Sequence, residues 1–588
     1  MGVKRLSSRG FKVLMAVGLL GVLGLLAGCG TGTSNPENGG DNTGGGGGNT
    51  VPSFEMTLSP DTLVVTQGEA GTLTLKIMPI NNFNGTVTLT LVNPPPGVEI
   101  SPSKVNVPGR EVSESLVVTT TLETPVGNHT VTVKGTSGDI EKSVSFRLTV
   151  NESLHFTVNT EKDTIDVKPG DGVCADADGN CSLRAAVMEA NALKAPVVIN
   201  VPEGVYELTN TSSSEEQDGD LDISADVIIK GAGPGATIID GGGKNRIFDI
   251  ADFKVSIEGL TIRNGGNVRH GGGIYNAGTL KLSRVEIVGN TATGSVWTDT
   301  GGGIHNAKVL SVKESYIHSN TTDNGGGIYS EGGSVLLIED SRIKDNKAYG
   351  WGGGLLLNGA DVVIQRSTIE NNQAGHGGGI LEDGGSLLVK NSTIANNRAD
   401  GNGGGILTRK ILGTVTASIL NSTISGNSAV DNGGGLRLEA GDEVLLQFST
   451  VANNKVISTQ GLGGGISVSG GNLSLKGTIL ANNSTEGGAG PDCAGAMTSL
   501  GYNLIESNAD CDIKIDLTDI TNQDPLLGDL ANNGGLTKTH MPLPESPAID
   551  QIPPDQCSDI EGNPVETDQR GIERPQGPKC DIGAVERN

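Results

Sequence analysis

This chain of 588 residues has a shortage of positive charge and lacks paired metal-binding cysteines. Its 41 lysines and arginines are outnumbered by 67 aspartates and glutamates, so the net charge of −26 makes nucleic acid and anionic lipid poor partners. No Cys-x-x-Cys spacing occurs, which argues against zinc ligation. The apolar run Val13–Leu26 is too short, and wrongly flanked, for a membrane-spanning helix.

The N-terminus instead has the pattern of a secretory leader. Four basic residues precede the apolar run, which ends in Leu26-Ala27-Gly28-Cys29. Residues 1–28 are therefore expected to be a signal peptide. The ending resembles the bacterial lipobox, which implies cleavage before Cys29 and diacylation of its sulfur, sufficient for stable anchoring. A plain signal peptide is the alternative. Loss of the leader lowers the net charge to −30.

Two segments of different composition follow the leader. Residues 29–51 are rich in glycine and polar residues, which predicts a flexible tether. Residues 52–151 contain short alternating runs broken by proline and glycine turns, which predict a β-sandwich. The stretches Asn93–Pro102 and Thr124–Asp139 resemble bacterial immunoglobulin-like modules. A spacer role is favoured for this segment over adhesion.

Residues 152–490 are assigned to one domain with a helical cap at its N-terminal end, and a glycine repeat runs through it from Gly271 to Ile466. Three glycines followed by Ile or Leu recur with a mean period near 27 residues, and each unit holds three short alternating runs with no helical period. This pattern predicts an all-β fold, namely a right-handed parallel β-helix preceded by the sandwich. The eight triplets begin at Gly271, Gly301, Gly325, Gly352, Gly377, Gly403, Gly433 and Gly463.

An asparagine follows each triplet about twenty residues later. Stacked turns of a β-helix place equivalent residues about 4.8 Å apart, so these side chains are expected to form a hydrogen-bonded ladder. The glycines are attributed to a corner requirement rather than to a glycine-floored ligand groove, and no helix follows them to make a phosphate loop. The ladder is predicted to comprise Asn290, Asn320, Asn346, Asn372, Asn397, Asn427, Asn454 and Asn483.

Six cysteines remain besides Cys29, and all lie outside the glycine repeats. An even number in an exported chain predicts disulfides, for which fifteen pairings are formally open. Local pairing is preferred, because irregular ends of a solenoid need covalent support. The preferred pairs are Cys174 with Cys181, Cys493 with Cys511, and Cys557 with Cys580.

The flanks of the repeats resemble known exported bacterial proteins. Cys181-Ser182-Leu183-Arg184-Ala185-Ala186 is similar to the Cys-Ser-Leu-Arg-Glu-Ala segment of exported β-helix proteins, with Ala185 replacing the Glu. It predicts a short capping helix with Ser182 as its N-cap. Residues 491–588, from Gly501-Tyr502-Asn503-Leu504 onward, resemble the choice-of-anchor Q region and are expected to form a disulfide-supported cap. The repeats resemble chlamydial polymorphic outer-membrane protein repeats, whose owners are surface adhesins.

The sequence gives weak signs of an enzyme. Gly375-His376-Gly377 and Arg342-Ile343-Lys344 match motifs of polygalacturonases, but their order is reversed and no adjacent aspartates lie in the repeats. His376 also occupies a position that is polar in other rungs. Two aspartate clusters match no calcium loop, and turn roles are preferred for them. The clusters are Asp218, Asp220, Asp222 and Asp226, and Asp171, Asp176 and Asp178.

One stripe is a candidate glycan-binding surface. Tyr275, His305 and Tyr329 each follow the first aliphatic residue of their unit, so they should align on consecutive rungs and point outward. They could stack on sugar rings, although a ladder that stacks only on itself is preferred.

The expected function is non-catalytic adhesion or glycan binding by a lipid-anchored protein of the cell envelope, at an outer membrane or cell surface. A polysaccharide lyase or glycoside hydrolase acting on acidic glycans is the first alternative, and a structural envelope protein is the second. The expected partners are the membrane, through the lipid anchor, and a polysaccharide or surface glycoprotein. No catalytic residue, cofactor or metal is assigned, and the chain is expected to be a monomer.

Overall fold

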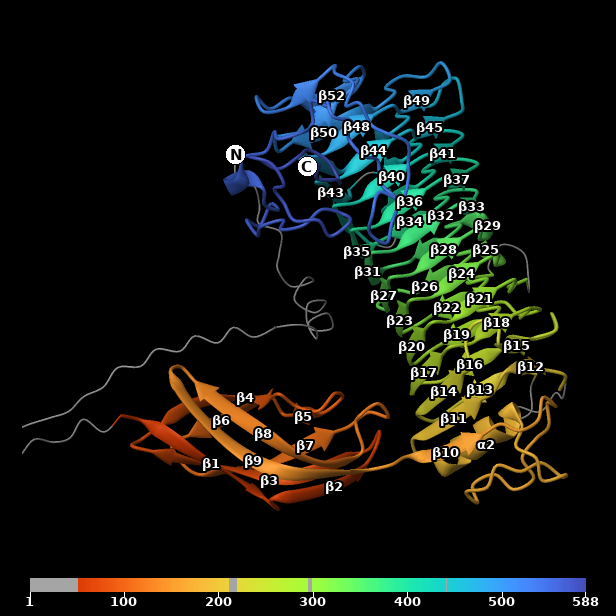
Figure 1. Cartoon of the computed structure of the whole chain (residues 1–588), viewed down its shortest axis with the longest axis vertical. Helices are drawn as coiled ribbons and strands as arrows, with labels where there is room; N and C mark the ends of the chain where they lie inside the picture. The colour runs from red at the N-terminus through yellow and green to blue at the C-terminus, as the bar shows by residue number, and fades with distance from the viewer. Residues whose placement is uncertain (1–50, 211–218, 294–298, 412, 440, 588) are drawn as a thin grey trace, which may run out of the picture.

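The computed structural model describes residues 51–210, 219–293, 299–411, 413–439 and 441–587. A β-sandwich is followed by a long right-handed parallel β-helix, and both are drawn in Figure 1. This confirms the predicted fold class. The predicted signal peptide, the lipidation site Cys29 and nearly all of the predicted tether lie outside the described residues. Among the described residues, no helix has the length and apolar character that crossing a membrane requires.

The sandwich has two sheets, with the strand orders β1-β3-β7-β5 and β2-β9-β8-β4-β6. Alternating apolar residues from both sheets, such as Leu75 and Val133, form its core. Glu123 in a loop of the sandwich pairs with Lys281 of the solenoid at 3.7 Å. The strands are β1 (Ser53–Ser59), β2 (Thr62–Thr66), β3 (Ala70–Ile80), β4 (Asn84–Val92), β5 (Glu99–Ser101), β6 (Lys104–Pro108), β7 (Val112–Thr119), β8 (Gly127–Ser137) and β9 (Ile140–Asn151).

Each turn of the solenoid contributes strands to parallel columns, which we call faces 1 to 4 in the order that the chain meets them after a glycine triplet. Each strand pairs in parallel with the equivalent strand one rung later, so Ile274, Ile304 and Ile328 align along the axis. Face 1 consists of β13 (Leu221–Ile223), β16 (Phe248–Ile250), β19 (Ile274–Asn276), β22 (Ile304–Asn306), β26 (Ile328–Ser330), β30 (Leu355–Leu357), β34 (Ile380–Asp383), β38 (Ile406–Arg409), β42 (Leu436–Leu438) and β46 (Ile466–Val468).

Faces 2 and 3 complete most of each rung. Face 2 consists of β10 (Leu154–Thr157), β11 (Val197–Val201), β14 (Val227–Gly231), β17 (Lys254–Glu258), β20 (Thr279–Ser283), β23 (Val309–Lys313), β27 (Val335–Glu339), β31 (Ala360–Gln365), β35 (Gly385–Lys390), β39 (Val415–Leu420), β43 (Glu443–Gln447), β47 (Asn472–Lys476), β50 (Cys493–Ser499) and β52 (Cys511–Lys514). Face 3 consists of β12 (Gly204–Glu207), β15 (Thr237–Asp240), β18 (Thr261–Arg263), β21 (Glu286–Val288), β24 (Tyr316–His318), β28 (Arg342–Lys344), β32 (Thr368–Glu370), β36 (Thr393–Ala395), β40 (Thr423–Ser425), β44 (Thr450–Ala452), β48 (Ile479–Ala481), β51 (Leu504–Ile505) and β53 (Ile520–Thr521).

Face 4 is the short column just before the glycine triplets. Inward aliphatic residues from faces 1 to 3 form one continuous core along the axis, which includes Leu282, Ile287 and Ile304. The strands of face 4 are β25 (Thr321–Asn324), β29 (Lys347–Trp351), β33 (Gln373–Ala374), β37 (Arg398–Ala399), β41 (Ser428–Ala429), β45 (Lys455–Val456) and β49 (Ser484–Thr485).

The glycine triplets form a corner between faces 4 and 1. The first glycine of every triplet has a positive φ, between 63° and 70°, which a residue with a side chain rarely adopts. The second glycine lies against the next rung, since a Cβ on Gly272 would stand 2.5 Å from the carbonyl oxygen of Gly302. The geometry of the corner therefore accounts for both glycines.

The predicted asparagines follow face 3 and hydrogen-bond from rung to rung. Asn372 is representative: its Nδ2 donates to Asn397 Oδ1 at 3.0 Å and to the carbonyl oxygen of Ile343 at 3.1 Å. Its own Oδ1 accepts from the backbone N and Nδ2 of Asn346, both at 3.0 Å. All eight asparagines are buried, so the ladder satisfies backbone groups that the core would otherwise leave unpaired.

Three disulfides join the cysteine pairs that the sequence favoured. Their Cα–Cα distances are 5.1 Å for Cys174–Cys181, 5.2 Å for Cys493–Cys511 and 6.2 Å for Cys557–Cys580. The first lies beside helix α2 (Leu183–Leu193), whose N-cap Ser182 accepts a hydrogen bond from the backbone N of Ala185.

The end of the chain folds back along the solenoid. After β53, the described residues up to 587 contain only a short 3-10 helix, η1 (Pro554–Gln556), and isolated bridges. This segment lies against the outer side of face 3, where the Thr393 hydroxyl donates to the carbonyl oxygen of Lys538 at 2.6 Å and the backbone N of Ala584 donates to Thr450 Oγ1 at 3.1 Å. Figure 1 shows this blue segment beside the last rungs.

Candidate functional site

A column of outward side chains on face 1 brings polar and aromatic residues together. The parallel register aligns Asp222, Asp249, Tyr275, His305 and Tyr329 on five consecutive rungs. Because rungs lie about 4.8 Å apart, this polar-aromatic column spans about 19 Å. It contains all three residues of the predicted glycan-binding stripe.

The aromatic members of the column stack on one another. The ring centroid of His305 lies 5.0 Å from that of Tyr275 and 4.8 Å from that of Tyr329. His305 is only 3% exposed, whereas both tyrosines are half-buried. The ring faces are therefore largely occupied by their neighbours. The tyrosines can offer a ligand their hydroxyls and ring edges more readily than open faces.

Hydrogen bonds fix the orientation of His305. Its Nε2 lies 2.8 Å from Glu331 Oε1, and its Nδ1 lies 2.8 Å from Thr300 Oγ1. The hydrogen bond with His305 lowers the pKa of Glu331, so this carboxylate accepts and Nε2 donates. With Nε2 as the donor, the other ring nitrogen, Nδ1, accepts from Thr300, which itself accepts from His270 Nδ1 at 2.7 Å. The imidazole of His305 is thus committed to holding the column together.

A cluster of carboxylates lies at the N-terminal end of the column. Carboxylate oxygens of Asp220, Asp222 and Asp249 lie within 4.8 Å of one another, a grouping that could hold a cation. The Arg246 guanidinium already pairs with Asp220 and with Asp249, each at 3.1 Å. It also lies 5.2 Å from the ring centroid of Tyr275. The guanidinium therefore supplies positive charge where a metal ion would otherwise be needed.

Burial shifts the titration of two groups at this end of the column. Burial raises the pKa of Asp249, the charge of Arg246 opposes this rise, and the charge of Asp220 adds to it. Burial also raises the pKa of the Tyr275 hydroxyl. This tyrosine is therefore a hydrogen-bond donor at neutral pH. Because its pKa is raised, Asp249 keeps its proton to a higher pH than an ordinary aspartate, as a proton donor in catalysis must.

Beyond Tyr329 the column becomes apolar. The next outward residues, Leu356, Leu381 and Leu407, are 4%, 0% and 2% exposed and form a small cluster with Tyr329. The glycine corner covers them, as a Cβ on Gly377 would stand 2.7 Å from the Cβ of Leu381. The polar-aromatic column thus ends at Tyr329, and polar residues return in this register only beyond Leu407, at Arg437 and Ser467.

The residues that match polygalacturonase motifs do not meet. His376 lies beside Trp351, just before a glycine triplet, and its Nδ1 accepts from the backbone N of Asn402 at 3.1 Å. Arg342 and Lys344 lie on β28 in face 3. The structure gives His376 the role of a corner residue.

Most other aspartates of the two predicted clusters bind backbone groups. Asp176 Oδ1 accepts from the backbone N of Asp178 and of Asn180, at 2.9 and 2.8 Å. Asp226 Oδ1 accepts from the backbone N of Lys254 at 2.8 Å, whereas Asp218 lies outside the described residues. Among the described members of the two clusters, only Asp222 belongs to the column, and Asp220 lies beside it.

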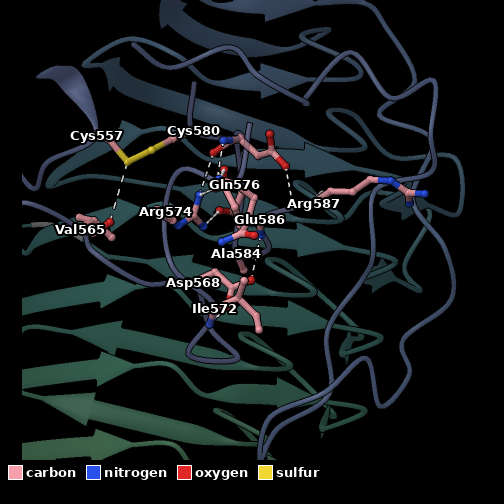
Figure 2. A network of polar contacts seen from close by, with 12 residues as sticks. Cys557, Val565, Asp568, Ile572, Arg574, Gln576, Cys580, Ala584, Glu586 and Arg587 are labelled. Carbon is pink, nitrogen blue, oxygen red and sulfur yellow. Dashed lines mark hydrogen bonds and ion pairs between the residues drawn. A yellow bond between two sulfur atoms is a disulfide. The ribbon is translucent and has the colours of Figure 1, made fainter. Parts of the chain in front are cut away.

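A second polar cluster is buried under the C-terminal segment (Figure 2). Arg574 pairs with Glu586 at 2.8 Å, and both side chains are fully buried. Arg574 also donates to the carbonyl oxygens of Asp581 and Gly583, and Glu586 accepts from the backbone N of Asp581. Burial raises the pKa of Glu586 to about 7, although the charge of Arg574 opposes this rise. Since the cluster is closed to solvent, it fastens the segment and offers no ligand site.

Sequence reasoning missed several residues that complete the column, because they lie outside the repeated motif. They are Arg246, Asp249 and Glu331. A signal existed for one of them: Phe248-Asp249-Ile250 occupies the register of Ile274-Tyr275-Asn276 one rung earlier. Extending the repeat towards the N-terminus would have placed Asp249 beside Tyr275.

Comparison with known proteins supports the fold. Residues 245–412 match the family described as "Right handed beta helix region". The comparison with curated proteins gave no match. Among solved structures, a point mutant of the SrpA adhesin from Streptococcus sanguinis is 14% identical, with 20% of this chain and 71% of that chain covered and a TM-score of 0.15. In fold, this chain is a right-handed parallel β-helix protein. The match to the adhesin is too weak to inform its function.

Proposed function

We propose that the protein is a surface binding protein that holds a glycan against face 1 without cleaving it. In this proposal, lipidation of Cys29 anchors the chain to the cell envelope and the sandwich is a spacer. The three disulfides are in keeping with export to an oxidising compartment.

The polar-aromatic column carries this proposal. It presents the hydroxyl-bearing edges of Tyr275 and Tyr329, the carboxylate of Glu331 and the Arg246 guanidinium on one rigid surface. Such groups recognise sugar hydroxyls by hydrogen bonding, and a rigid scaffold lowers the entropic cost of binding. The buried His305 is committed to internal hydrogen bonds, which favours recognition over proton transfer.

A second candidate function, glycoside hydrolysis, rests on the carboxylate cluster. Retaining glycosidases use two carboxyl groups roughly 5 Å apart, one acting as a proton donor and the other as a nucleophile. Asp222 and Asp249 approach this spacing, and burial raises the pKa of Asp249, as a proton donor requires. The ion pairs of Arg246 with this cluster weigh against the hydrolase, because they hold the carboxylates in a structural role.

One experiment separates these functions. Residues 52–588 are run through gels containing neutral or acidic polysaccharides, and the same mixtures are assayed for new reducing ends. Binding predicts retardation without new ends, and we expect Tyr275→Ala combined with Tyr329→Ala to weaken it about tenfold. Tyr316→Ala is the matched control, since Tyr316 stacks on His318 in face 3, away from the column.

Two other results would redirect the proposal. New reducing ends that disappear in Asp249→Asn would establish the hydrolase. If no polysaccharide is retained or cleaved, the structural envelope role stands instead.

A further inference from the structure

A pair of exposed aromatic side chains lies on face 4, outside the polar-aromatic column. In the described ranges only three aromatic residues are strongly exposed: Phe253, Tyr349 and Trp351. Tyr349 and Trp351, 58% and 40% exposed, lie two positions apart on β29. Strand alternation turns both outward with Lys347, while Ala348, which lies between Lys347 and Tyr349, is buried. β29 has five residues, whereas the later strands of face 4 have two each.

A cation lies against each of these rings. Lys347 Nζ is 4.8 Å from the ring centroid of Tyr349, and Arg409 Cζ is 4.1 Å from that of Trp351. Asp383 holds Arg409 through an ion pair of 2.9 Å, with both side chains largely buried. A cation–π contact to a fixed guanidinium restrains the indole, so little side-chain entropy remains to be lost on binding.

We propose that Tyr349 and Trp351 form a stacking platform for the pyranose rings of a neutral glycan. This inference rests on the proposed glycan-binding function and extends its site. A ring that is restrained and still exposed matches the C–H face of a sugar, while the sugar hydroxyls remain free to bond polar neighbours. β29 completes the turn that begins with Tyr329 and ends directly before Gly352, whose triplet leads to Leu356 on the next rung. The platform thus lies on the face next to the column, across the glycine corner.

Charge favours a neutral glycan over an acidic one. Arg409 is already balanced by Asp383, and the chain carries a net charge of −26, so a polyanion would meet overall repulsion. The neighbours disfavour a protein partner, because the residues aligned with Trp351 before the adjacent glycine triplets are Asn324 and His376. Two isolated rings between polar positions do not make the continuous surface that a stable protein interface buries.

The test uses Trp351 as its own reporter. The chain has two tryptophans, so Trp297→Phe leaves Trp351 alone, and its fluorescence is titrated with hydroxyethyl cellulose, galactomannan and polygalacturonate. We expect a neutral glycan to shift the emission, and Trp351→Ala to weaken binding of that glycan in affinity gels by about tenfold. Tyr349→Ala should cause a smaller loss. Tyr316→Ala is again the control, and circular dichroism verifies folding of each variant.

The outcomes are distinct. Retention of a neutral glycan with unchanged affinity in Trp351→Ala overturns the platform while leaving the proposed function intact. A preference for polygalacturonate that depends on Trp351 overturns the neutral class. Retention of a deglycosylated mucin polypeptide, lost in Trp351→Ala, assigns the platform to protein partners and also overturns the inference. If the unsubstituted chain binds none of these, the proposed function fails together with the platform.

Discussion

The asparagine ladder and the cluster under the C-terminal segment both bury polar side chains, but they satisfy them in opposite ways. The ladder repeats one neutral amide, and each member between the two ends bonds to the same groups one rung away. The C-terminal cluster instead consists of charged side chains that occur once. Arg574 donates its hydrogen bonds to groups within residues 581–586. When one asparagine of the ladder is removed, the neutral groups left unpaired are spread over the neighbouring rungs. When one partner of the ion pair is removed, the other is left as an unpaired buried charge.

The largest expected effect tests the charged side of this comparison. Arg574→Met should destabilise the C-terminal segment by about 4 kcal/mol, because it leaves Glu586 buried without its counter-ion. Burial raises the pKa of Glu586 to about 7 from 4.5, so the loss should be greater at pH 8 than at pH 5, where the carboxyl group is protonated. Hydrogen exchange of the amides in residues 565–587 at both pH values measures this loss of stability.

A double substitution supplies the control for this prediction. Arg574→Met combined with Glu586→Leu removes both charges, so we expect it to recover most of the stability. An equal loss in the single and double variants would show that packing, rather than the unpaired charge, fastens the segment.

The second prediction tests the neutral ladder. Asn372→Ala leaves the backbone N and Nδ2 of Asn346 without their acceptor and the carbonyl oxygen of Ile343 without a donor. We expect a cost of about 3 kcal/mol, confined to neighbouring rungs, because solenoid stability is a sum of nearest-neighbour terms. The measurement is hydrogen exchange of the amides in residues 340–375.

Ser367→Ala is the matched control within the same rung. In a parallel serine ladder, the Ser367 hydroxyl accepts from the backbone N of Ser341 at 3.1 Å and donates to the carbonyl oxygen of Gln365 at 2.8 Å. Its loss removes fewer hydrogen bonds than the loss of the Asn372 side chain and should cost about 1 kcal/mol. If both variants lost the same amount of stability, the asparagine side chains would stabilise the stacked rungs no more than the serine side chains do.

The repeated features are the ones that the sequence could predict. A fixed period reveals the rungs, the glycine corner and the asparagines, because each recurs in the same register. The serine ladder of Ser341 and Ser367 was accessible in the same way, as a serine two residues before an aliphatic one, but it was missed.

Residues that occur once could not be placed from the sequence. Arg246 and Asp249 meet Tyr275 only because successive rungs bring segments about 26 residues apart into contact. Trp351 meets Arg409 across two further rungs, and no local pattern announces such a pair. The stacking of rungs brings a residue that occurs once into contact with residues from several other rungs. Which residues meet at a site on a solenoid therefore depends on the register between rungs.

Glu382 combines the two cases, since it is a charged residue that occurs once within a repeated inward column. It lies between Leu357 and Thr408, is fully buried, and neither of its carboxylate oxygens has a hydrogen-bond partner in the described part of the chain. Burial raises its pKa well above 4.5, and the charges of Asp383, Asp361 and Asp442 raise it further.

This burial makes stability depend on pH. A pKa that is higher in the folded state favours folding fully below about pH 4.5, and this contribution is lost as the pH rises towards the folded value. Glu382→Leu should therefore be more stable than the parent chain by about 2 kcal/mol at pH 8 and by less at pH 5. Thermal unfolding across this range measures the difference. Glu382→Gln keeps the shape but cannot ionise, so it should share the weaker pH dependence. If the Glu382→Gln variant kept the pH dependence of stability of the parent chain, that dependence would come from other groups. The buried carboxyl group would then affect stability no differently from a buried neutral amide.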